Sequence, residues 1–220
     1  FIVYYAKPRN ADEKTLIALI KASQLTQVFA ELSKHMVIPK SVVIYVGGGI
    51  SDGPYFTSSA KLGITNKAIV FPLEFANLII DVFRKEYPKA SDYELGKYFA
   101  SVQYFALFHE LGHALVNLWS IPVLGREEDA VDAFSTIFML EFVPDIGGNI
   151  AIDGADFFDF LSRNEKLDTA SFADEHSLSK QRVYSILCWV YGANPKKYAG
   201  IKNILPRERL VRCASEYAQL

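Results

Sequence analysis

The chain has 220 residues, of which half are hydrophobic and 14% aromatic, so it is long and apolar enough to bury the core of a globular domain. Its formal net charge is −2 and its basic residues are dispersed, so its charge does not indicate binding to nucleic acid or to an anionic membrane. No apolar run approaches the roughly 18 residues of a membrane-spanning helix, so we expect no membrane span.

The first third of the chain is predicted to form a small sheet and one long helix. Asn10 can cap a helix over about 11–34. The glycines at 47–49 precede no Gly-Lys-Ser/Thr, so they indicate a turn and not a phosphate-binding loop. Segments rich in β-branched and aromatic residues predict a mainly antiparallel sheet, namely "FIVYYA" at 1–6, "SVVIYV" at 41–46, "PYFTSS" at 54–59 and "NKAIVFP" at 66–72.

The rest of the chain has a helical pattern almost to its end. A sheet followed by a run of helices is typical of the α+β class. We expect a single domain over 1–220, with a sheet-rich lobe at 1–72 and a helical lobe at 73–220. Apolar residues recur at helical spacing between clusters of Gly, Pro, Asn and Asp, which predicts helices near 73–86, 92–119, 126–142, 156–162, 179–191 and 206–218.

Three polar side chains interrupt the otherwise apolar helix expected at 92–119. His109 and His113 are four positions apart and so project from one face, where two imidazoles can bind one Zn²⁺. Glu110 lies beside that face, where its carboxylate can take a proton from a water on the metal. The alternative is a pair of core histidines satisfied by Glu110 and nearby hydroxyls. Without a metal, each of the three buried groups needs its own partner, so the pattern favours zinc.

An acidic cluster soon after this helix offers a third metal ligand. The two helices are expected to form an antiparallel pair, which brings the second back across the first. Acidic residues in a first turn can also simply complement the helix dipole, which suits Glu127 and Asp129. We assign Glu128 as the third ligand. Asp132 shares its face and is expected to accept the free N–H of a ligating histidine; Asp132 as the direct ligand is the main alternative.

These motifs carry a family resemblance. "HELGH" followed by a helix with Glu128 and Asp132 four positions apart is similar to the gluzincin branch of zinc metallopeptidases, typified by thermolysin. The segments "FHELGHALV", "LGREEDAVD" and "DEHSLSKQRVYSILCWVYG" resemble more closely a bacterial family of proposed metallopeptidases, classed as a domain of unknown function. The resemblance implies a zincin-like fold with one catalytic Zn²⁺ and a peptide or protein substrate.

A third histidine, His176, lies in "ADEHS" just before a later helix. Thermolysin-like enzymes use a late histidine to donate to the oxyanion that forms when water attacks a carbonyl, so the resemblance implies this role for His176. Asp174 or Glu175 could hold its ring. Tyr184 and Arg182, on the helix that follows, are alternative oxyanion donors. The other interpretation is a polar, capped loop with a solvated histidine.

In zincins an extended substrate commonly lies antiparallel to a strand that borders the cleft. The resemblance implies this role for the strand in "ITNKAIVFP" at 64–72, as an edge strand that pairs with substrate main chain. The alternative is an ordinary internal strand.

Two features bear on where the protein works. Cys188 and Cys213 fall in the last two predicted helices, either as two buried thiols or as one disulfide, and a disulfide would fit export. The sequence opens at Phe1 and not at methionine, so we expect that a preceding segment has been removed, for example a signal peptide. Together these features favour a periplasmic or secreted bacterial protein.

The leading functional hypothesis is zinc-dependent hydrolysis of peptide bonds, with Glu110 as the general base. Two hypotheses from other classes stand beside it. One is a non-catalytic binding module that keeps the zincin fold and holds a partner. The other is a structural zinc protein, in which a fourth protein ligand such as His176 or Asp129 closes the metal.

Overall fold

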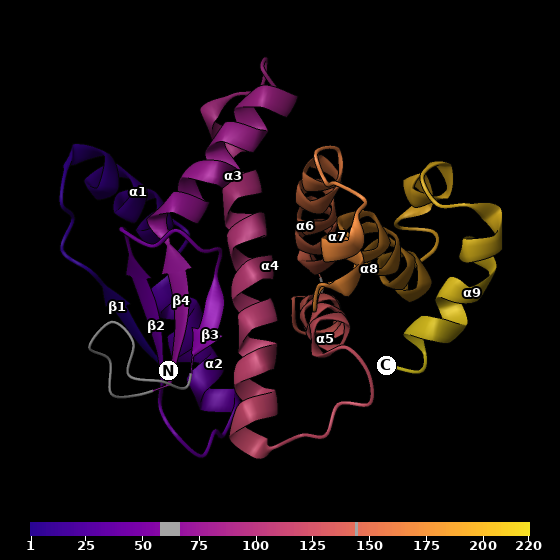
Figure 1. Ribbon diagram of the computed structural model, residues 1–220, viewed down its shortest axis with the longest axis horizontal. Coiled ribbons are helices and arrows are strands. Elements are labelled where there is room, and N and C mark those ends of the chain that lie inside the picture. Colours follow the sequence, from indigo (N-terminus) through magenta and orange to yellow (C-terminus); the bar gives the residue numbers. More distant parts are fainter. Residues whose placement is uncertain (58–66, 144) are drawn as a thin grey trace. The chain divides into compact units, whose positions relative to one another are not determined.

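The structure is a computed structural model that describes residues 1–57, 67–143 and 145–220. The chain forms two compact units, one of residues 1–103 with 110–122 and one of residues 104–109 with 123–220. Helix α4 (Asp92–Trp119) is continuous and contributes residues to both. The fold is mixed α+β, mostly helical with a small sheet, in agreement with the predicted class (Figure 1).

The sheet lies in the first unit and is mixed rather than mainly antiparallel, so that prediction is wrong. β1 pairs with β2 in parallel, and β2 with β4 in parallel, while β3 runs antiparallel to β4. The chain between β1 and β2 forms helices, and such a crossover returns it to the same end of the sheet. Across the sheet the described strands are ordered β1 (Ile2–Tyr5), β2 (Val42–Gly47), β4 (Lys67–Pro72) and β3 (Tyr55–Thr57).

The crossover consists of two helices, α1 (Ala11–Ala22) and α2 (Leu25–His35), where the sequence predicts one. Gln24 separates them in the left-handed conformation, with a φ of 61°. Its N–H donates to the carbonyl of Lys21, and this bond closes the end of α1. The apolar pattern continues through the break because residues on both sides of it are buried, namely Ile17, Ile20, Leu25 and Phe29.

β4 is an internal strand of the described sheet. It pairs with β2 along its whole length and with β3 on its other side. The expectation that this segment is an edge strand available to substrate is therefore wrong, and its alternative, an ordinary internal strand, is confirmed. The parts of the two predicted strands that fall at 58–66 lie outside the described residues.

The glycines that end β2 and follow it form a bend in the chain, and charged side chains contact this bend. Gly49 has a φ of 84°, and its N–H donates to Glu74 Oε1 at 2.6 Å. The Arg9 guanidinium packs so closely that a Cβ on Gly49 would lie 2.6 Å from Arg9 Nη1. Arg9 in turn pairs with the buried Glu13 of α1. The glycine therefore serves both a left-handed backbone and a close approach by Arg9.

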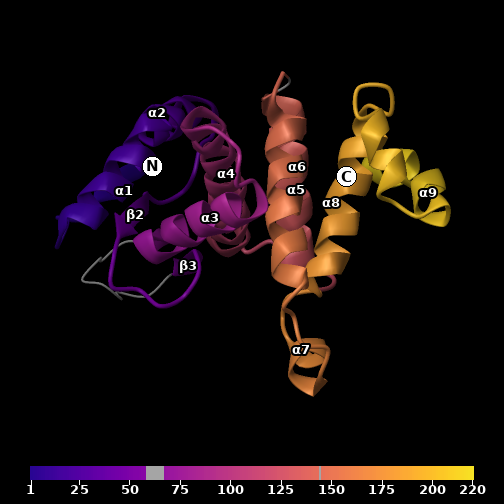
Figure 2. The same ribbon diagram turned by 90° about the horizontal axis from the view of Figure 1, so that it is seen from above.

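The second unit is helical, with α8 at its centre. α8 contacts α5, α6, α9 and the 3₁₀ helix η2, and Figure 2 shows α6 and α8 side by side. The predicted helices of this unit are found, whereas α7 and η2 were not predicted. Its elements are α5 (Glu127–Phe142), α6 (Gly147–Ser162), α7 (Thr169–Ala173), α8 (Ser179–Ala193), η2 (Ala199–Asn203) and α9 (Arg207–Tyr217).

α6 begins at Gly147, well before the predicted start near 156. A Cβ on Gly147 would lie 1.8 Å from the carbonyl oxygen of Met139 in α5, so this position accepts only glycine. The start of α6 was not predicted from the sequence because glycine is a poor helix former. In the first unit, α3 (Leu73–Glu86) and α4 match their predicted ranges.

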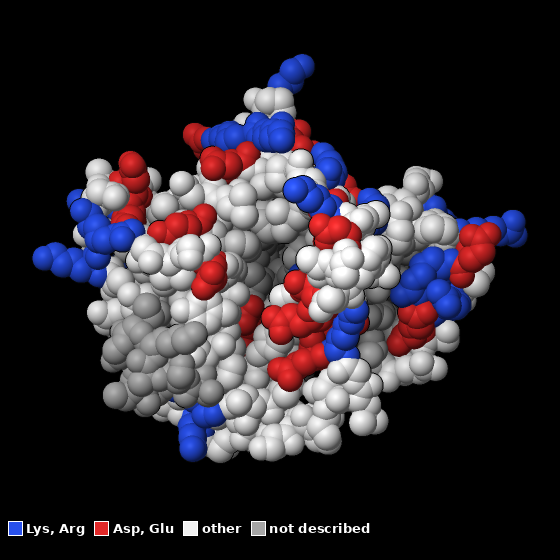
Figure 3. All heavy atoms as spheres, viewed as in Figure 1, with Lys and Arg blue, Asp and Glu red and all other residues white. Residues whose placement is uncertain are grey.

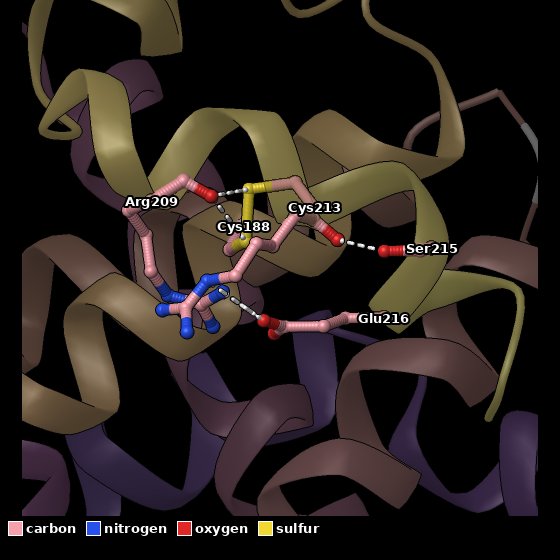
Figure 4. Close-up of a disulfide and its surroundings, with 6 residues drawn as sticks. Cys188, Arg209, Cys213, Ser215 and Glu216 are labelled. Atoms are coloured by element: carbon pink, nitrogen blue, oxygen red, sulfur yellow. Dashed lines mark hydrogen bonds and ion pairs between the residues drawn. A yellow bond between two sulfur atoms is a disulfide. The ribbon is translucent and has the colours of Figure 1, made fainter.

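Cys188 of α8 and Cys213 of α9 form a disulfide, which decides between the two alternatives for this pair (Figure 4). Both residues are fully buried. On α9, Arg209 Nη1 donates to Glu216 Oε1 at 2.5 Å beside the bond. The disulfide ties α9 to the helix that carries Arg182.

Both signs of charge are present on the described surface seen in Figure 3, and the basic side chains form no continuous area there. This agrees with the small net charge of −2. Among the described residues, none of the helices has the length and apolar character to cross a membrane.

Candidate metal centre

The long helix α4 carries both histidines and Glu110, of which His109 and Glu110 are buried and His113 is half-buried. Ser91 starts the helix in a capping box, accepting from the Glu94 N–H while Glu94 Oε2 accepts from the Ser91 N–H at 2.8 Å. His109 and Glu110 are only 6% and 7% exposed. His113 follows one turn later on the same helix, so the helix itself sets its position relative to His109. The helix thus places two ionisable groups in buried positions and a third, His113, in a half-buried one.

Helix α5 supplies the two acidic residues that face His109. Nδ1 of His109 lies 2.8 Å from Asp132 Oδ1, and Nε2 lies 3.0 Å from Glu128 Oε2. Asp132 is 2% exposed, and the Glu128 side chain is 12% exposed. The neighbouring Glu127 and Asp129 are exposed, which fits the simple dipole interpretation for those two residues.

Arg182 from α8 completes the surroundings of Asp132. Its Nε donates to Asp132 Oδ2 at 2.7 Å, and its Nη2 donates to Oδ1 at 2.8 Å. Burial raises the pKa of the Asp132 carboxyl, but the Arg182 charge and the hydrogen bonds from Arg182 and His109 outweigh burial and lower that pKa to about 2. Asp132 is therefore an ionised acceptor with both oxygens occupied.

The Arg182 guanidinium is itself held in place. Its central carbon lies 3.8 Å from the ring centroid of Phe158, on α6. Burial lowers the pKa of Arg182, but the Asp132 charge and hydrogen bonds raise it further than burial lowers it. The predicted role of Arg182 was an oxyanion donor, whereas the structure places two of its nitrogens on Asp132.

The loop before α8 brings His176 to the same carboxylate. His176 Nε2 lies 3.1 Å from Glu128 Oε2, and its Nδ1 lies 3.0 Å from Asp174 Oδ1. The hydrogen bond with Glu128 raises the pKa of His176, and this effect exceeds the opposite effect of burial. His176 thus has carboxylate partners at both ring nitrogens, and of the two residues expected to hold its ring, Asp174 is the one in contact with it.

The donor set of this cluster suits a divalent metal. One ligand atom each of His109, His113 and Glu128 lies within 4.8 Å of the others. Two imidazoles and a carboxylate are zinc ligands, and in a tetrahedral site with bonds near 2.1 Å they lie about 3.4 Å apart. The three residues are therefore close enough together to be candidates for holding one ion. Glu128, Glu175 and His176 form a second group of possible ligands, which shares Glu128 with the first.

Tyr184 is the other predicted oxyanion donor. Among the described residues, none of the hydrogen bonds and ion pairs of this cluster involves it. The Lys180 ammonium lies over its ring, 5.5 Å from the centroid.

Arg126 was not singled out from sequence, yet its Nη1 donates to the carbonyl oxygen of His176 at 2.9 Å. No local pattern marks this contact, because the two residues are 50 positions apart.

Comparison with known families agrees with the resemblance seen in the motifs. A family model described as "Putative metallopeptidase" matches residues 5–220, so the chain belongs to this family. No curated protein and no solved structure matches the chain.

Proposed function

We propose that the protein is a zinc-dependent peptidase of the gluzincin type, built on a zincin-like fold. The observation that carries this proposal is that two carboxylates and a second imidazole lie around the His109 ring. Its Nδ1 faces Asp132 while its Nε2 faces Glu128, and His113 adds a second imidazole. When His109 is neutral with its proton on Nδ1, its Nε2 presents a lone pair toward the Glu128 carboxylate, and a cation between the two atoms would be bound by both. The family description supports a metal-dependent peptidase as well.

In this proposal His109, His113 and Glu128 hold one Zn²⁺. Asp132 accepts the Nδ1–H of His109, which fixes the tautomer and gives Nε2 the lone pair that would bind the metal. Arg182 keeps Asp132 ionised and oriented. When bound, zinc supplies a Lewis acid that polarises the scissile carbonyl and lowers the pKa of water toward about 7.

Glu110 is the proposed general base. It lies next to His109 on α4 and is rotated by roughly 100° around the helix, beside the ligands and not among them. Its carboxylate accepts a proton from the attacking water and passes it to the nitrogen of the leaving amine. His176 is the proposed oxyanion donor from sequence, although its Nε2 lies against Glu128 in the structure.

The disulfide supports a further part of the proposal, namely that the protein works in an oxidising compartment such as the bacterial periplasm or the exterior of the cell. Disulfides persist in such compartments and are rare where thiols are kept reduced. The Cys188–Cys213 bond links two buried residues and so belongs to the folded core.

Removal of the metal tests the proposed activity. We expect the wild-type protein to cleave members of a mixed peptide library, to lose cleavage after dialysis against a zinc chelator, and to regain it with one equivalent of Zn²⁺. The products are measured by mass spectrometry. Full cleavage by protein shown to be metal-free would contradict the proposal. Peptides that bind but are never cut, with zinc present, would favour a binding module.

A further inference from the structure

We propose that His176 is a positioning residue for Glu128, holding the carboxylate of this ligand in place and thereby setting the affinity for the metal. The inference rests on the proposed function, because it takes Glu128 as a metal ligand. It gives His176 a role that differs from oxyanion donation. In that other role the ring acts on substrate, whereas here it acts through a side chain of the protein.

The contacts of the Glu128 carboxylate carry the proposal. Its Oε2 lies 3.0 Å from Nε2 of His109 and 3.1 Å from Nε2 of His176. The same oxygen therefore lies between the imidazole that would share the metal and an imidazole from the loop before α8. A carboxylate oxygen can accept from two sides, so the bond to His176 persists while Glu128 turns its remaining lone pairs to an ion.

The His176 ring is fixed on its other side. Asp174 Oδ1 lies 3.0 Å from Nδ1 of His176 and also accepts the backbone N–H of His176 at 2.8 Å. One carboxylate oxygen thus binds both the ring and the backbone of the same residue, which restricts rotation of the imidazole. An imidazole bound at both nitrogens holds Glu128 at a defined position.

The loop backbone is also tied to the start of α5. Arg126 directly precedes this helix, and its Nη1 donates to the carbonyl oxygen of His176 at 2.9 Å. Glu128 lies two positions later and bonds the ring of the same histidine. Two residues from one helix start therefore bind one loop residue, through its backbone and through its side chain. This double contact makes the position of His176 depend on α5 and not on the loop alone.

The arrangement matters because glutamate has three rotatable side-chain bonds. A ligand that is held before the metal arrives loses less conformational freedom on binding, and so binds more tightly. Partners of metal ligands typically change metal affinity by about 10–100-fold when they are removed. His109 has such a partner in Asp132. The proposal assigns His176 as the corresponding partner of Glu128.

Zinc affinity of His176 variants tests the proposal. Full-length wild type, His176→Ala and His176→Gln are titrated with Zn²⁺ against a chromophoric chelator. We expect His176→Ala to bind zinc about 10–100-fold more weakly. His176→Gln should stay within about threefold of wild type, because an amide N–H can still donate to Glu128 whereas Gln is a poor zinc ligand.

His35→Ala is the matched control. His35 Nε2 also lies 3.1 Å from a glutamate oxygen, that of Glu31, but on the exposed surface of α2. It should leave zinc affinity unchanged. Arg126→Ala, which releases the loop backbone without altering the ring, should weaken zinc binding in the same direction as His176→Ala. This variant keeps the test informative if His176→Ala does not fold.

Each outcome has a defined meaning. Unchanged zinc affinity in His176→Ala, with a loss of peptide hydrolysis, would overturn the proposal in favour of an oxyanion donor. Equal weakening in His176→Gln and His176→Ala would overturn it in favour of His176 as a direct metal ligand. Wild type that binds no zinc in the same titration would contradict the proposed function itself, so the two failures are distinguishable.

Discussion

Glu110→Gln will lower the rate of peptide hydrolysis by about 10²–10⁴-fold while the protein keeps its zinc. The amide has the size of the carboxylate but cannot accept the proton of the attacking water. The residue is 7% exposed, so an isosteric replacement is needed to avoid a cavity. Initial rates on a peptide cleaved by wild type, with zinc measured on the same samples, give both quantities.

Glu127→Gln is the matched control for this experiment. It removes the same charge from an exposed position at the start of α5 and should change neither rate nor zinc content by more than about twofold. If Glu110→Gln hydrolysed the peptide at the wild-type rate, Glu110 would not be the general base. If it lost zinc together with activity, Glu110 would act on the metal and not on the water.

Asp132→Asn will lower the free energy of unfolding by about 3–5 kcal/mol and weaken zinc binding by about 10–100-fold. The variant leaves the Arg182 guanidinium, whose side chain is only 11% exposed, without the carboxylate that accepts two of its hydrogen bonds. It also removes the charged acceptor of the His109 Nδ1–H. Urea unfolding of the metal-free proteins and zinc titration measure the two effects separately.

The double variant Asp132→Leu with Arg182→Met separates the two roles of Asp132. Replacing both members of a buried ion pair with apolar side chains is often nearly neutral, so stability should recover relative to Asp132→Asn. Zinc affinity should stay low, because His109 still lacks its acceptor. Zinc affinity restored together with stability would show that Asp132 acts only through the fold.

The helices were predictable from sequence where local chemistry determines them. The capping box at Ser91 and the apolar residues after it define α4, and the spacing of His109 and His113 places both on one face of it. The facing acidic residues were predictable as a set. Glu128 and Asp132 are four positions apart and so share one face of α5. In the structure Asp132 contacts Nδ1 of His109 and Glu128 contacts Nε2.

The sheet was not predictable in the same way, because strand direction depends on connections that no strand carries in its own residues. "NKAIVFP" and "SVVIYV" are apolar on both faces, which is typical of parallel strands buried between layers. That signal was present in the sequence, yet short segments between turns favoured an antiparallel interpretation. The break at Gln24 and the early start of α6 at Gly147 likewise depend on packing that overrides helix propensity.

Contacts over long sequence separations were the least predictable part of the site. Arg182 and Asp132 are 50 positions apart, and so are Arg126 and His176. A basic residue on a helix more often lies along the surface with its charge in water, so its sequence context does not indicate a buried ion pair. The acidic residues and histidines proposed as ligands were recognisable by type, whereas the residues that contact them became visible only in the fold.

The central claim is that His109, His113 and Glu128 bind one zinc ion. Elemental analysis of purified wild type and His113→Ala, both dialysed in metal-free buffer after loading with Zn²⁺, tests it most directly. We expect one zinc per chain in wild type and a content near zero in His113→Ala, with both proteins folded. Folded wild type without stoichiometric zinc, or equal zinc in the two proteins, would contradict the claim.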